Sequence, residues 1–423
     1  MLEHIDTVIV GGGQGGLATS YHLTQQGIPH VVLEKKDRPA PTWEDERWDS
    51  FTLVTPNWSF RLPGAEYRGD RPDDFMSRDE IVARFRDYVE QYRLPLRYDT
   101  EVVSIERADE AQSLRVRTRD AGFLARNVVV ATGLFQFPRL HPAASRLPSD
   151  IVQLHSSQYR NPSALPPGNV LVVGSSQSGC QIANELMSSG RQVYLSVGAS
   201  CRLPRRYRGH DCTEWLERLG LWDKTADTLP SPNARFAPSP QLAGRHDGED
   251  LDLHRFAAEG MRLLGHLENI VGDHIHLRDD LAENLEKADR LEATFLAAVD
   301  QFVQAKGLDA PAEHRPIRDE GYEVEPVRTL SLLREGISSV IWATGYGFDF
   351  GMVRFPVFDS DGYPQQRRGV TNVPGLYFVG LPWLHKQKSG LIAGVGEDAE
   401  YVASSISERA IRSRESVAID SVA

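Results

Sequence analysis

A strand, a glycine-rich turn, a helix and a second strand follow one another twice in the 423 residues, which predicts an α/β protein with two Rossmann-like units. In the first copy, these four elements are expected at residues 7–10, 11–16, about 17–26 and 30–34. In the second copy, they are expected at residues 169–173, 174–179, about 180–189 and 192–196. Hydrophobic residues make up 40% and charged residues 25%, which is ordinary globular composition for two or three domains.

Further elements are predicted outside the two copies. Ser77 with Glu80 three residues later forms a capping box, so a helix is expected from there to about Tyr92. Strands are expected at 97–106, 113–120, 127–131 and 338–343. Segment 376–400 is expected to form a strand, a loop and a helix that begins near Glu397 and Asp398.

The repeat also sets the expected domain boundaries. The first unit is predicted to comprise residues 1–160 and 345–423, and the second residues 161–344, after a proline-rich linker at 141–168. Residues 203–250 are expected to form a loop with short helices. Helical patterns at about 250–310 predict a helical insertion in the second unit.

Charge and cysteine content exclude several classes of function. The net charge of −12 argues against nucleic-acid binding by general electrostatics. The three cysteines, Cys180, Cys201 and Cys212, form neither C-x-x-C nor a disulfide framework, and no metal site is predicted. No signal peptide and no run of about 18 apolar residues is present, so we expect a cytoplasmic protein with no membrane partner.

The first glycine turn has the G-x-G-x-x-G pattern of a dinucleotide site, with Gly11, Gly13 and Gly16 around Gln14. Its glycines allow the tight turn, the approach of a pyrophosphate and the close packing of helix on strand. Glu34, 18 residues after Gly16, ends the next strand and can accept hydrogen bonds from ribose hydroxyls. This pattern suits either FAD or a nicotinamide dinucleotide, and the second turn decides between them.

The second glycine turn favours NADPH, which leaves FAD for the first. Its residues are Gly174, Ser175, Ser176, Gln177, Ser178 and Gly179. The following strand ends in Ser196 rather than an acid, and Arg202, Arg205 and Arg206 come soon after it. A carboxylate would repel the 2′-phosphate of NADPH, whereas a guanidinium binds it with two hydrogen bonds. The alternative is that these arginines only form a solvated face of a loop.

With these motifs, the chain resembles the class B flavin-dependent monooxygenases, which include flavin-containing monooxygenases, N-hydroxylating enzymes and Baeyer–Villiger enzymes. The resemblance rests on Ala131-Thr132-Gly133, on Ala343-Thr344-Gly345-Tyr346, on the segment 375–380 that ends in Gly380, and on the segment 53–64. It implies that Asn57 lies near the reactive carbon of the flavin. Trp43 and Val103 are further predicted cofactor-binding residues.

One family motif is only half present. His155 and Tyr159 match the F-x-G-x-x-x-H-x-x-x-Y signature, but Ser149 and Ile151 replace its phenylalanine and glycine. Tyrosine at the end of the signature favours enzymes other than the Baeyer–Villiger class. Taken alone, His155 is better explained as a packed histidine between domains than as a proton carrier.

The resemblance implies that NADPH reduces the flavin and that a flavin C4a-(hydro)peroxide then oxygenates a soft nucleophile, an amine nitrogen or a sulfide, of a small molecule. Asn57 is the candidate catalytic residue, and the Gln177 region is a second hydrogen-bond donor. Trp383, His385 and Lys388 are candidates for the substrate entrance. The partners are then the substrate and molecular oxygen, and the assembly is left open between monomer and homodimer.

Four other functions remain as alternatives at this point. A Baeyer–Villiger enzyme would oxygenate a ketone, and a flavin or NADPH oxidase would transfer no oxygen atom. A redox-sensing protein could share the fold without catalysis. A disulfide reductase would need a redox-active cysteine pair, which the chain lacks.

Overall fold

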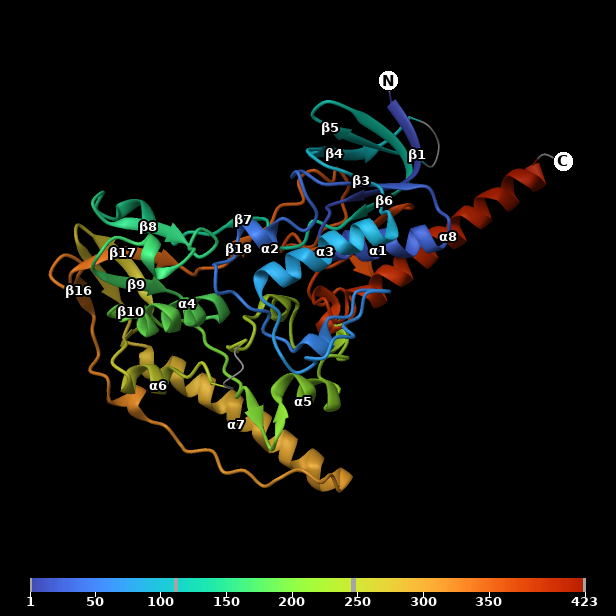
Figure 1. Ribbon diagram of the computed structural model, residues 1–423. Helices are drawn as coiled ribbons and strands as arrows, with labels where there is room; N and C mark the ends of the chain where they lie inside the picture. The colour runs from blue at the N-terminus through green and yellow to red at the C-terminus, as the bar shows by residue number, and fades with distance from the viewer. Residues whose placement is uncertain (1, 110–112, 245–248, 421–423) are drawn as a thin grey trace.

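The computed structural model describes residues 2–109, 113–244 and 249–420, and two separate sheets organise them (Figure 1). The first sheet contains β1 (Leu2–Val10), β2 (His30–Leu33), β3 (Leu96–Arg97), β4 (Val102–Arg107), β5 (Leu114–Thr118), β6 (Gly122–Val130), β19 (Gln366–Arg367), β20 (Val370–Thr371) and β21 (Leu376–Phe378). The second contains β8 (Val152–His155), β9 (Asn169–Val173), β10 (Val193–Ser196), β13 (Arg262–Leu264) and β17 (Ile337–Trp342). The predicted α/β class is confirmed.

The two sheets share one strand order. The order β3-β2-β1-β6-β21 in the first corresponds to β13-β10-β9-β17-β8 in the second, and all of these neighbours pair in parallel. In each sheet one helix connects the central strand to the next: α1 (Gln14–Gln25) follows β1, and α4 (Gln177–Ser188) follows β9. The internal repeat expected from the sequence is therefore present as a repeat of strand order.

The central strands end in buried apolar runs, Val8–Val10 in β1 and Val170–Val173 in β9, because both faces of each sheet are covered there. In β1, Ile9 packs with Leu17 of α1, whereas Val8 and Val10 pack in the cluster formed by β4 and β5 on the other face. The long helix α8 (Val395–Asp420) lies against α1 and starts close to the predicted position.

Two smaller predictions of the first unit also hold. Ser77 and Glu80 form the expected capping box, with Ser77 as the N-cap of α3 (Arg78–Tyr92). The strands predicted at 97–106 and 113–120 are largely present as the antiparallel pair β4–β5.

The predicted boundary at residue 160 is wrong in one respect. Strand β8, which the prediction gave to the first unit, pairs in parallel with β17 as the edge strand of the second sheet. The proline content of 141–168 concealed this short strand, because prolines are tolerated around an edge strand. The second sheet therefore already takes in residues from Val152.

The predicted helical insertion at 250–310 is only partly helical. It contains α6 (Leu253–Ala258) and α7 (Leu281–Lys306), but between them lie β13 and the antiparallel strands β14 (Leu267–Val271) and β15 (His274–Leu277). A third strand, β16 (Thr329–Ser331), pairs with β15. Leu267 and Ile270, with Ile275 and Leu277, bury their side chains against the second sheet, and this apolar layer forms strands rather than helix.

The part of the chain between β10 and α6 reaches across to the first unit. It contains β11 (Arg206–Tyr207), β12 (His210–Asp211), α5 (Cys212–Arg218) and the short 3-10 helices η4 (Ala226–Thr228) and η5 (Pro232–Phe236). We call its described residues 203–244 the cap. Within the described residues, no helix combines the length and apolar character needed to cross a membrane.

The remaining elements are short. They are α2 (Thr42–Asp45), η1 (Asn57–Ser59), β7 (Phe137–Pro138), η2 (Ala144–Arg146), η3 (Pro162–Ala164), η6 (Glu320–Glu323), β18 (Tyr346–Gly347) and η7 (Gln387–Gly390). Strands β7 and β18 pair antiparallel, which brings the two chain segments that cross between the units together.

Candidate functional site

The first glycine turn has no room for side chains at two of its glycines. Gly11 has a φ of +107°, and a β-carbon there would lie 2.8 Å from the carbonyl oxygen of Ala131. A β-carbon on Gly16 would overlap the carbonyl oxygen of Gly11. These two glycines therefore hold strand, turn and helix in contact.

Gly13 is different, because it faces open space. Apart from its own chain neighbours, no protein atom is found within 4 Å of the position that its β-carbon would take. It is the N-cap of α1 and makes no side-chain capping bond. The first amides of α1 are thus available to an anion, and the missing side chain leaves room for it. This is a cradle that fits a pyrophosphate.

The residues around Gly13 fix the geometry of this cradle. The Glu34 carboxylate accepts hydrogen bonds from the amides of Gly12 at 2.8 Å and Lys36 at 3.0 Å, and the residue is 5% exposed. Gln14 donates through Nε2 to the carbonyl of Gly390 at 2.7 Å, which joins α1 to η7. Gly15 packs on Gly380, where a β-carbon would lie 3.2 Å from the Gly380 Cα.

The second glycine turn repeats this geometry position by position. Gly174 has a φ of +106° and lies against the carbonyl of Ala343, as Gly11 lies against Ala131. A β-carbon on Gly179 would overlap the carbonyl oxygen of Gly174. Ser176 is the N-cap of α4 with φ −75° and ψ −172°, close to the −83° and −173° of Gly13, and its side chain makes no capping bond.

The repeat shows that Ser196 is not the counterpart of Glu34. The amide of Gly11 bonds to the carbonyl of Leu33, and the amide of Gly174 bonds to the carbonyl of Ser196, so Ser196 corresponds to Leu33. The next residue, Val197, occupies the position of Glu34. Ser196 instead bonds through Oγ to the carbonyl of Gly265 at 3.0 Å and accepts from the amide of Leu267 at 3.0 Å. The second unit therefore still has no acid at the position of Glu34, because Val197 occupies it.

The structure contradicts the predicted role of Arg202. Its guanidinium is enclosed by the carboxylates of Asp252, Asp289 and Glu292, with the closest contacts at 2.6, 2.8 and 2.5 Å. The residue is 8% exposed. A guanidinium that already satisfies three carboxylates has no free face for a phosphate. Arg202 instead joins the loop after β10 to α6 and α7.

The prediction for Arg205 is wrong for a similar reason. Its guanidinium, 1% exposed, donates to the carbonyls of Val54 at 2.8 Å and Ala243 at 3.0 Å and pairs with Asp211. It therefore lies between the segment 53–64 and the cap. Arg206 is exposed on β11.

The polar side chains of the second turn are also committed to the protein. Gln177 donates to the carbonyl of Leu242 and accepts from its amide at 3.0 Å, so its amide group is not free for a peroxide as predicted. Ser175 accepts through Oγ from the amide of Gly198 at 3.2 Å. Ser178, in the first turn of α4, is half-buried.

The two A-T-G turns lie at the ends of corresponding strands, β6 and β17. The amide of Ala131 bonds to Val10 at 2.8 Å and that of Ala343 to Val173 at 2.9 Å. Thr132 and Gly133 accept hydrogen bonds from Gln136. Thr344 donates to the carbonyl of Arg139, and the carbonyl of Gly345 bonds to the ring of His155 at 3.0 Å. These turns thus hold the crossing segments together.

His155 is a packed histidine, as the sequence suggested. It is 1% exposed, and its two ring nitrogens contact the Ser157 hydroxyl at 2.9 Å and the Gly345 carbonyl. Burial lowers the pKa of His155, so the neutral imidazole is favoured.

Asn57 is buried in η1 and keeps one polar atom without a partner. Its Nδ2 donates to the carbonyl of Arg71 at 2.8 Å, but its Oδ1 has no hydrogen-bond partner. A buried acceptor of this kind is rare unless a ligand or water satisfies it. Asn57 therefore remains the predicted residue with a free acceptor on the segment 53–64.

Of the two further predicted cofactor-binding residues, Trp43 lies close to the first glycine turn and Val103 is exposed on β4. Ala40 donates to the carbonyl of Gly12 at 2.9 Å and accepts from the amide of Trp43, so Trp43 lies one turn after a contact with the glycine turn. Val103 lies at an irregularity of the β4–β5 pairing, with 42% of its surface exposed.

The cap covers the first unit through contacts that sequence reasoning missed. Glu217 pairs with Arg61 through two hydrogen bonds at 2.6 and 3.1 Å, and Trp222 lies 6.4 Å from Trp58 between ring centroids. Asp223 binds the ammonium groups of Lys386 at 2.8 Å and Lys388 at 3.0 Å. These partners are more than 150 residues apart along the chain, so no local sequence pattern predicts their contacts.

His385 and Lys388, predicted for a substrate entrance, lie beneath this cap. Lys388 is 8% exposed and also pairs with Glu397 at 2.6 Å. His385 Nδ1 lies 3.9 Å from Oδ1 of Asp398, which is 1% exposed. Burial raises the pKa of Asp398, and burial together with the Arg368 charge lowers the pKa of His385. A charged pair is thus disfavoured here.

Asp398→Asn is expected to stabilise the protein more at pH 8 than at pH 4. Between the ordinary aspartate pKa of 3.8 and the raised pKa of Asp398, the folded state binds more protons than the unfolded state, so stability falls as pH rises. The asparagine has no such loss. Urea unfolding at pH 4, 6 and 8 measures the difference, with exposed Asp150→Asn as control. Equal pH slopes for wild type and Asp398→Asn would contradict the raised pKa.

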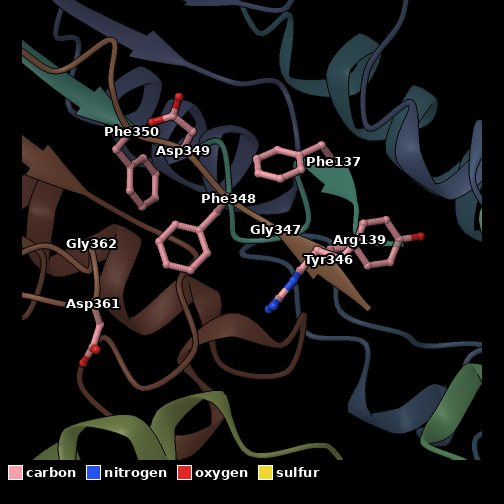
Figure 2. Close-up of a pocket in the computed structure, with 9 residues that line it drawn as sticks. All are labelled: Phe137, Arg139, Tyr346, Gly347, Phe348, Asp349, Phe350, Asp361 and Gly362. Atoms are coloured by element: carbon pink, nitrogen blue, oxygen red, sulfur yellow. The ribbon is translucent and has the colours of Figure 1, made fainter. Parts of the chain in front are cut away.

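Two cavities open near these elements. One, of about 410 Å³, lies between the cap loop 226–235, the segment 359–366 and Trp383. Trp383 has a φ of +57°, a strained conformation for a bulky side chain, of the kind that concentrates at functional sites. The other, of about 350 Å³, lies beside the crossing segments, where Phe137, Phe348 and Phe350 place their rings around it and the Asp361 carboxylate points away (Figure 2).

The cysteines do not form a dithiol site. Cys180 and Cys212 are buried, and burial raises the pKa of Cys212 to about 12 and that of Cys201 to about 11. The nucleophile in thiol exchange is the thiolate, which such pKa values suppress at neutral pH.

Comparison with known proteins agrees with this architecture. A family model described as pyridine nucleotide-disulphide oxidoreductase matches residues 8–209. An uncharacterized CzcO-like oxidoreductase of Geobacillus kaustophilus is 34% identical over 409 residues, which cover 96% of this chain and 99% of that protein. The chain belongs to the CzcO-like oxidoreductases. A probable indole-3-pyruvate monooxygenase of Arabidopsis thaliana, YUCCA1, is 29% identical over about half of each chain, 48% and 49%.

Solved structures share the fold at low identity. A flavin-containing monooxygenase from Stenotrophomonas maltophilia has a TM-score of 0.64 at 19% identity and covers 97% of this chain and all of its own. The ornithine N-hydroxylase of Kutzneria, with reduced FAD and NADP⁺, has 0.62 at 16%, over 96% and 99%. The bacillithiol disulfide reductase of Staphylococcus aureus has 0.62 at 14%, over the same shares. The predicted resemblance to flavin monooxygenases and the prediction of an oxidoreductase are confirmed.

Proposed function

We propose that this oxidoreductase binds FAD at the first glycine turn and NADPH at the second and oxygenates a soft nucleophile of a small organic substrate. The observation that carries the proposal is the pair of geometrically equivalent glycine turns of which only the first has a carboxylate, Glu34, where the second has Val197. Two equivalent turns support two dinucleotides, and the missing carboxylate supports a 2′-phosphate on the second.

The residues of the first unit fit FAD. The open space at Gly13 and the amides of α1 suit its pyrophosphate, and Glu34 suits its ribose. The free Oδ1 of Asn57 suits a hydrogen-bond donor of the ligand beside the segment 53–64. When bound, the flavin supplies the redox and oxygen chemistry, and the protein supplies position and the exclusion of water.

We further propose that His266 takes the role predicted for Arg202 and Arg205. Its Nδ1 lies 3.2 Å from where a β-carbon on Gly198 would be, directly after Val197. His266 is exposed there and can donate to a phosphate. We expect His266→Ala to raise the Kd of NADP⁺ about 5- to 10-fold, the loss of one charge-assisted hydrogen bond, and to leave that of NAD⁺ unchanged. Calorimetry with both nucleotides measures this, and an equal change for both would contradict the role.

The cap supports a small substrate held next to the first unit. Its contacts with Trp58, Arg61 and the segment 385–388 close that side of the fold against water, and the cavity beside Trp383 lies at the edge of this contact. A shielded site suits a reaction in which water would destroy a reactive intermediate.

Oxygen uptake with NADPH tests the proposed reaction. The purified protein is supplied with NADPH and a panel of amines, sulfides and ketones, and the products are identified by mass spectrometry with ¹⁸O₂. Label in an amine or sulfide product supports the proposal, and label in an ester would move the enzyme to the Baeyer–Villiger alternative. Oxygen consumption that yields only hydrogen peroxide with every compound would support an oxidase instead.

A disulfide reductase shares the fold, as the bacillithiol enzyme shows. Its chemistry requires a thiolate that attacks or leaves a disulfide. The raised thiol pKa values of Cys201 and Cys212 and the burial of Cys180 argue against this reaction in the present chain.

A further inference from the structure

The four residues Gln241–Gly244, which we call the bridge, run through the contact between the two units. All four are buried. The bridge belongs to the cap. Because it is buried, its backbone amides and carbonyls and the Gln241 side chain need hydrogen-bond partners. Those partners come from opposite sides of the molecule.

On one side, the bridge is bonded to the second glycine turn. Gln241 donates through Nε2 to the carbonyl of Ser175 and to the Ser200 hydroxyl. Leu242 bonds through both its amide and its carbonyl to the side chain of Gln177, and its carbonyl also accepts from Gln181 at 3.1 Å. Ser175 and Gln177 flank Ser176, the N-cap of α4.

On the other side, the bridge is bonded to the first unit. Thr52 donates through Oγ1 to the carbonyl of Gly244 at 2.6 Å. Arg205 donates through one nitrogen both to the Ala243 carbonyl at 3.0 Å and to the Val54 carbonyl at 2.8 Å. The backbones also approach closely, because a β-carbon on Gly244 would lie 2.5 Å from the carbonyl oxygen of Leu53.

We infer that Thr52 and Arg205 are positioning residues that set the segment 52–57, through the bridge, at a fixed distance from the second glycine turn. Segment 52–57 ends at Asn57, whose free acceptor faces the flavin in the proposed function. The inference rests on that function, in which NADPH gives a hydride to FAD and becomes NADP⁺ while FAD becomes the anionic reduced form, FADH⁻. Hydride transfer requires reacting atoms about 3–3.5 Å apart, and a misplacement of about 1 Å can slow a reaction about 100-fold.

The structural reason for assigning position rather than binding is that neither side chain reaches a predicted dinucleotide contact. The Thr52 hydroxyl bonds to Gly244, and the Arg205 guanidinium is enclosed by Val54, Ala243, Asp211 and its neighbours. Removing either bond leaves both glycine turns and their helices intact. Substitution of Thr52 or Arg205 should therefore leave the affinity for NADP⁺ nearly unchanged and lower the rate of flavin reduction.

Thr52→Val is the most direct test, because it removes the hydroxyl and keeps the shape. We expect the FAD content and the unfolding temperature to match wild type. The Kd of NADP⁺ by calorimetry should stay within about twofold of the wild-type value. The anaerobic rate of flavin reduction at saturating NADPH should fall about 10-fold, on the scale of a sub-ångström misplacement. The change in the flavin absorbance spectrum on NADP⁺ addition should also be altered. Arg205→Lys, which loses the second guanidinium nitrogen that pairs with Asp211 and the rigid fork that aims the first one at both carbonyls, should slow reduction further.

Thr24→Val is the matched control, because the Thr24 hydroxyl bonds to the Ser20 carbonyl within α1 at 2.8 Å. It should leave both the rate and the spectrum at wild-type values. If Thr52→Val reduces at the same limiting rate and gives the same difference spectrum as Thr24→Val, the positioning role is wrong while the proposed function stands. If NADPH does not reduce the flavin of the wild-type protein, the proposed function fails and the inference fails with it.

Discussion

Gly13→Ala is expected to weaken FAD binding by roughly 10- to 100-fold while the apoprotein unfolds at the wild-type temperature. The backbone angles of Gly13, φ −83° and ψ −173°, are accessible to alanine, and its new methyl group would meet no protein atom within 4 Å beyond its chain neighbours. The methyl would instead occupy the space left for the pyrophosphate. Forcing a methylene into a filled site costs about 1–3 kcal/mol, which corresponds to the expected loss of affinity.

Flavin titration of the apoprotein and its thermal unfolding measure the two expected effects separately. Gly16→Ala is the contrasting variant, because its β-carbon overlaps the carbonyl of Gly11 and should destabilise the apoprotein itself. Ser176→Gly is the control in the second unit and should leave FAD affinity unchanged. Unaltered FAD affinity in Gly13→Ala would mean that the open space at Gly13 does not receive the cofactor.

The sequence predicted those parts of the site that depend on neighbouring residues. The G-x-G-x-x-G turn, its Glu34, the capping box at Ser77 and the apolar strands all depend on interactions within about 35 residues or within one sheet. Their geometry follows from φ angles and side-chain size, which a local pattern records. The equivalence of the two turns followed for the same reason.

The failures involve distant partners. The sequence predicts a phosphate role for Arg202 because arginines suit phosphates, but the carboxylates of Asp252, Asp289 and Glu292 enclose its guanidinium. The sequence predicts helix where β14 and β15 lie, because short strands that pair with each other and with β16 leave little periodicity. Contacts between the cap and the first unit join loop and helix residues more than 150 positions apart, so they could not be read from spacing.

The residue of the second unit that corresponds to Glu34 can be found from the sequence itself. Glu34 is 18 residues after Gly16, and the same count from Gly179 leads to Val197 rather than Ser196. The structure confirms the count, because the amide of Glu34 bonds to Arg97 and that of Val197 bonds to Leu264 on the corresponding strand. An internal repeat thus allows corresponding residues to be found by counting from one copy to the other, which a single motif does not allow.

Val197→Glu is expected to weaken NADPH binding on the order of 100-fold and to strengthen NADH binding. A carboxylate at this position would sit where Glu34 sits in the first unit, beside the ribose 2′-oxygen. Two like charges about 4 Å apart repel by about 4 kcal/mol near a protein surface, and screening by water and salt reduces this toward the roughly 2.7 kcal/mol of a 100-fold loss. NADH has no charge there and gains hydrogen bonds to its ribose hydroxyls.

Val197→Gln separates the effect of charge from the effect of size, because glutamine has the shape of glutamate but carries no charge. It should change the affinity for the two nucleotides by similar, small factors. Calorimetry with NADPH and NADH on both variants gives the ratio of their Kd values, with thermal unfolding to show that the buried substitution keeps the fold. The amides of Ser175 and Ala199 correspond to those of Gly12 and Lys36, so the new carboxylate has donors available. An unchanged Kd ratio in Val197→Glu would show that the second turn does not hold the adenosine ribose at this strand end, and the assignment of NADPH to that turn would fall.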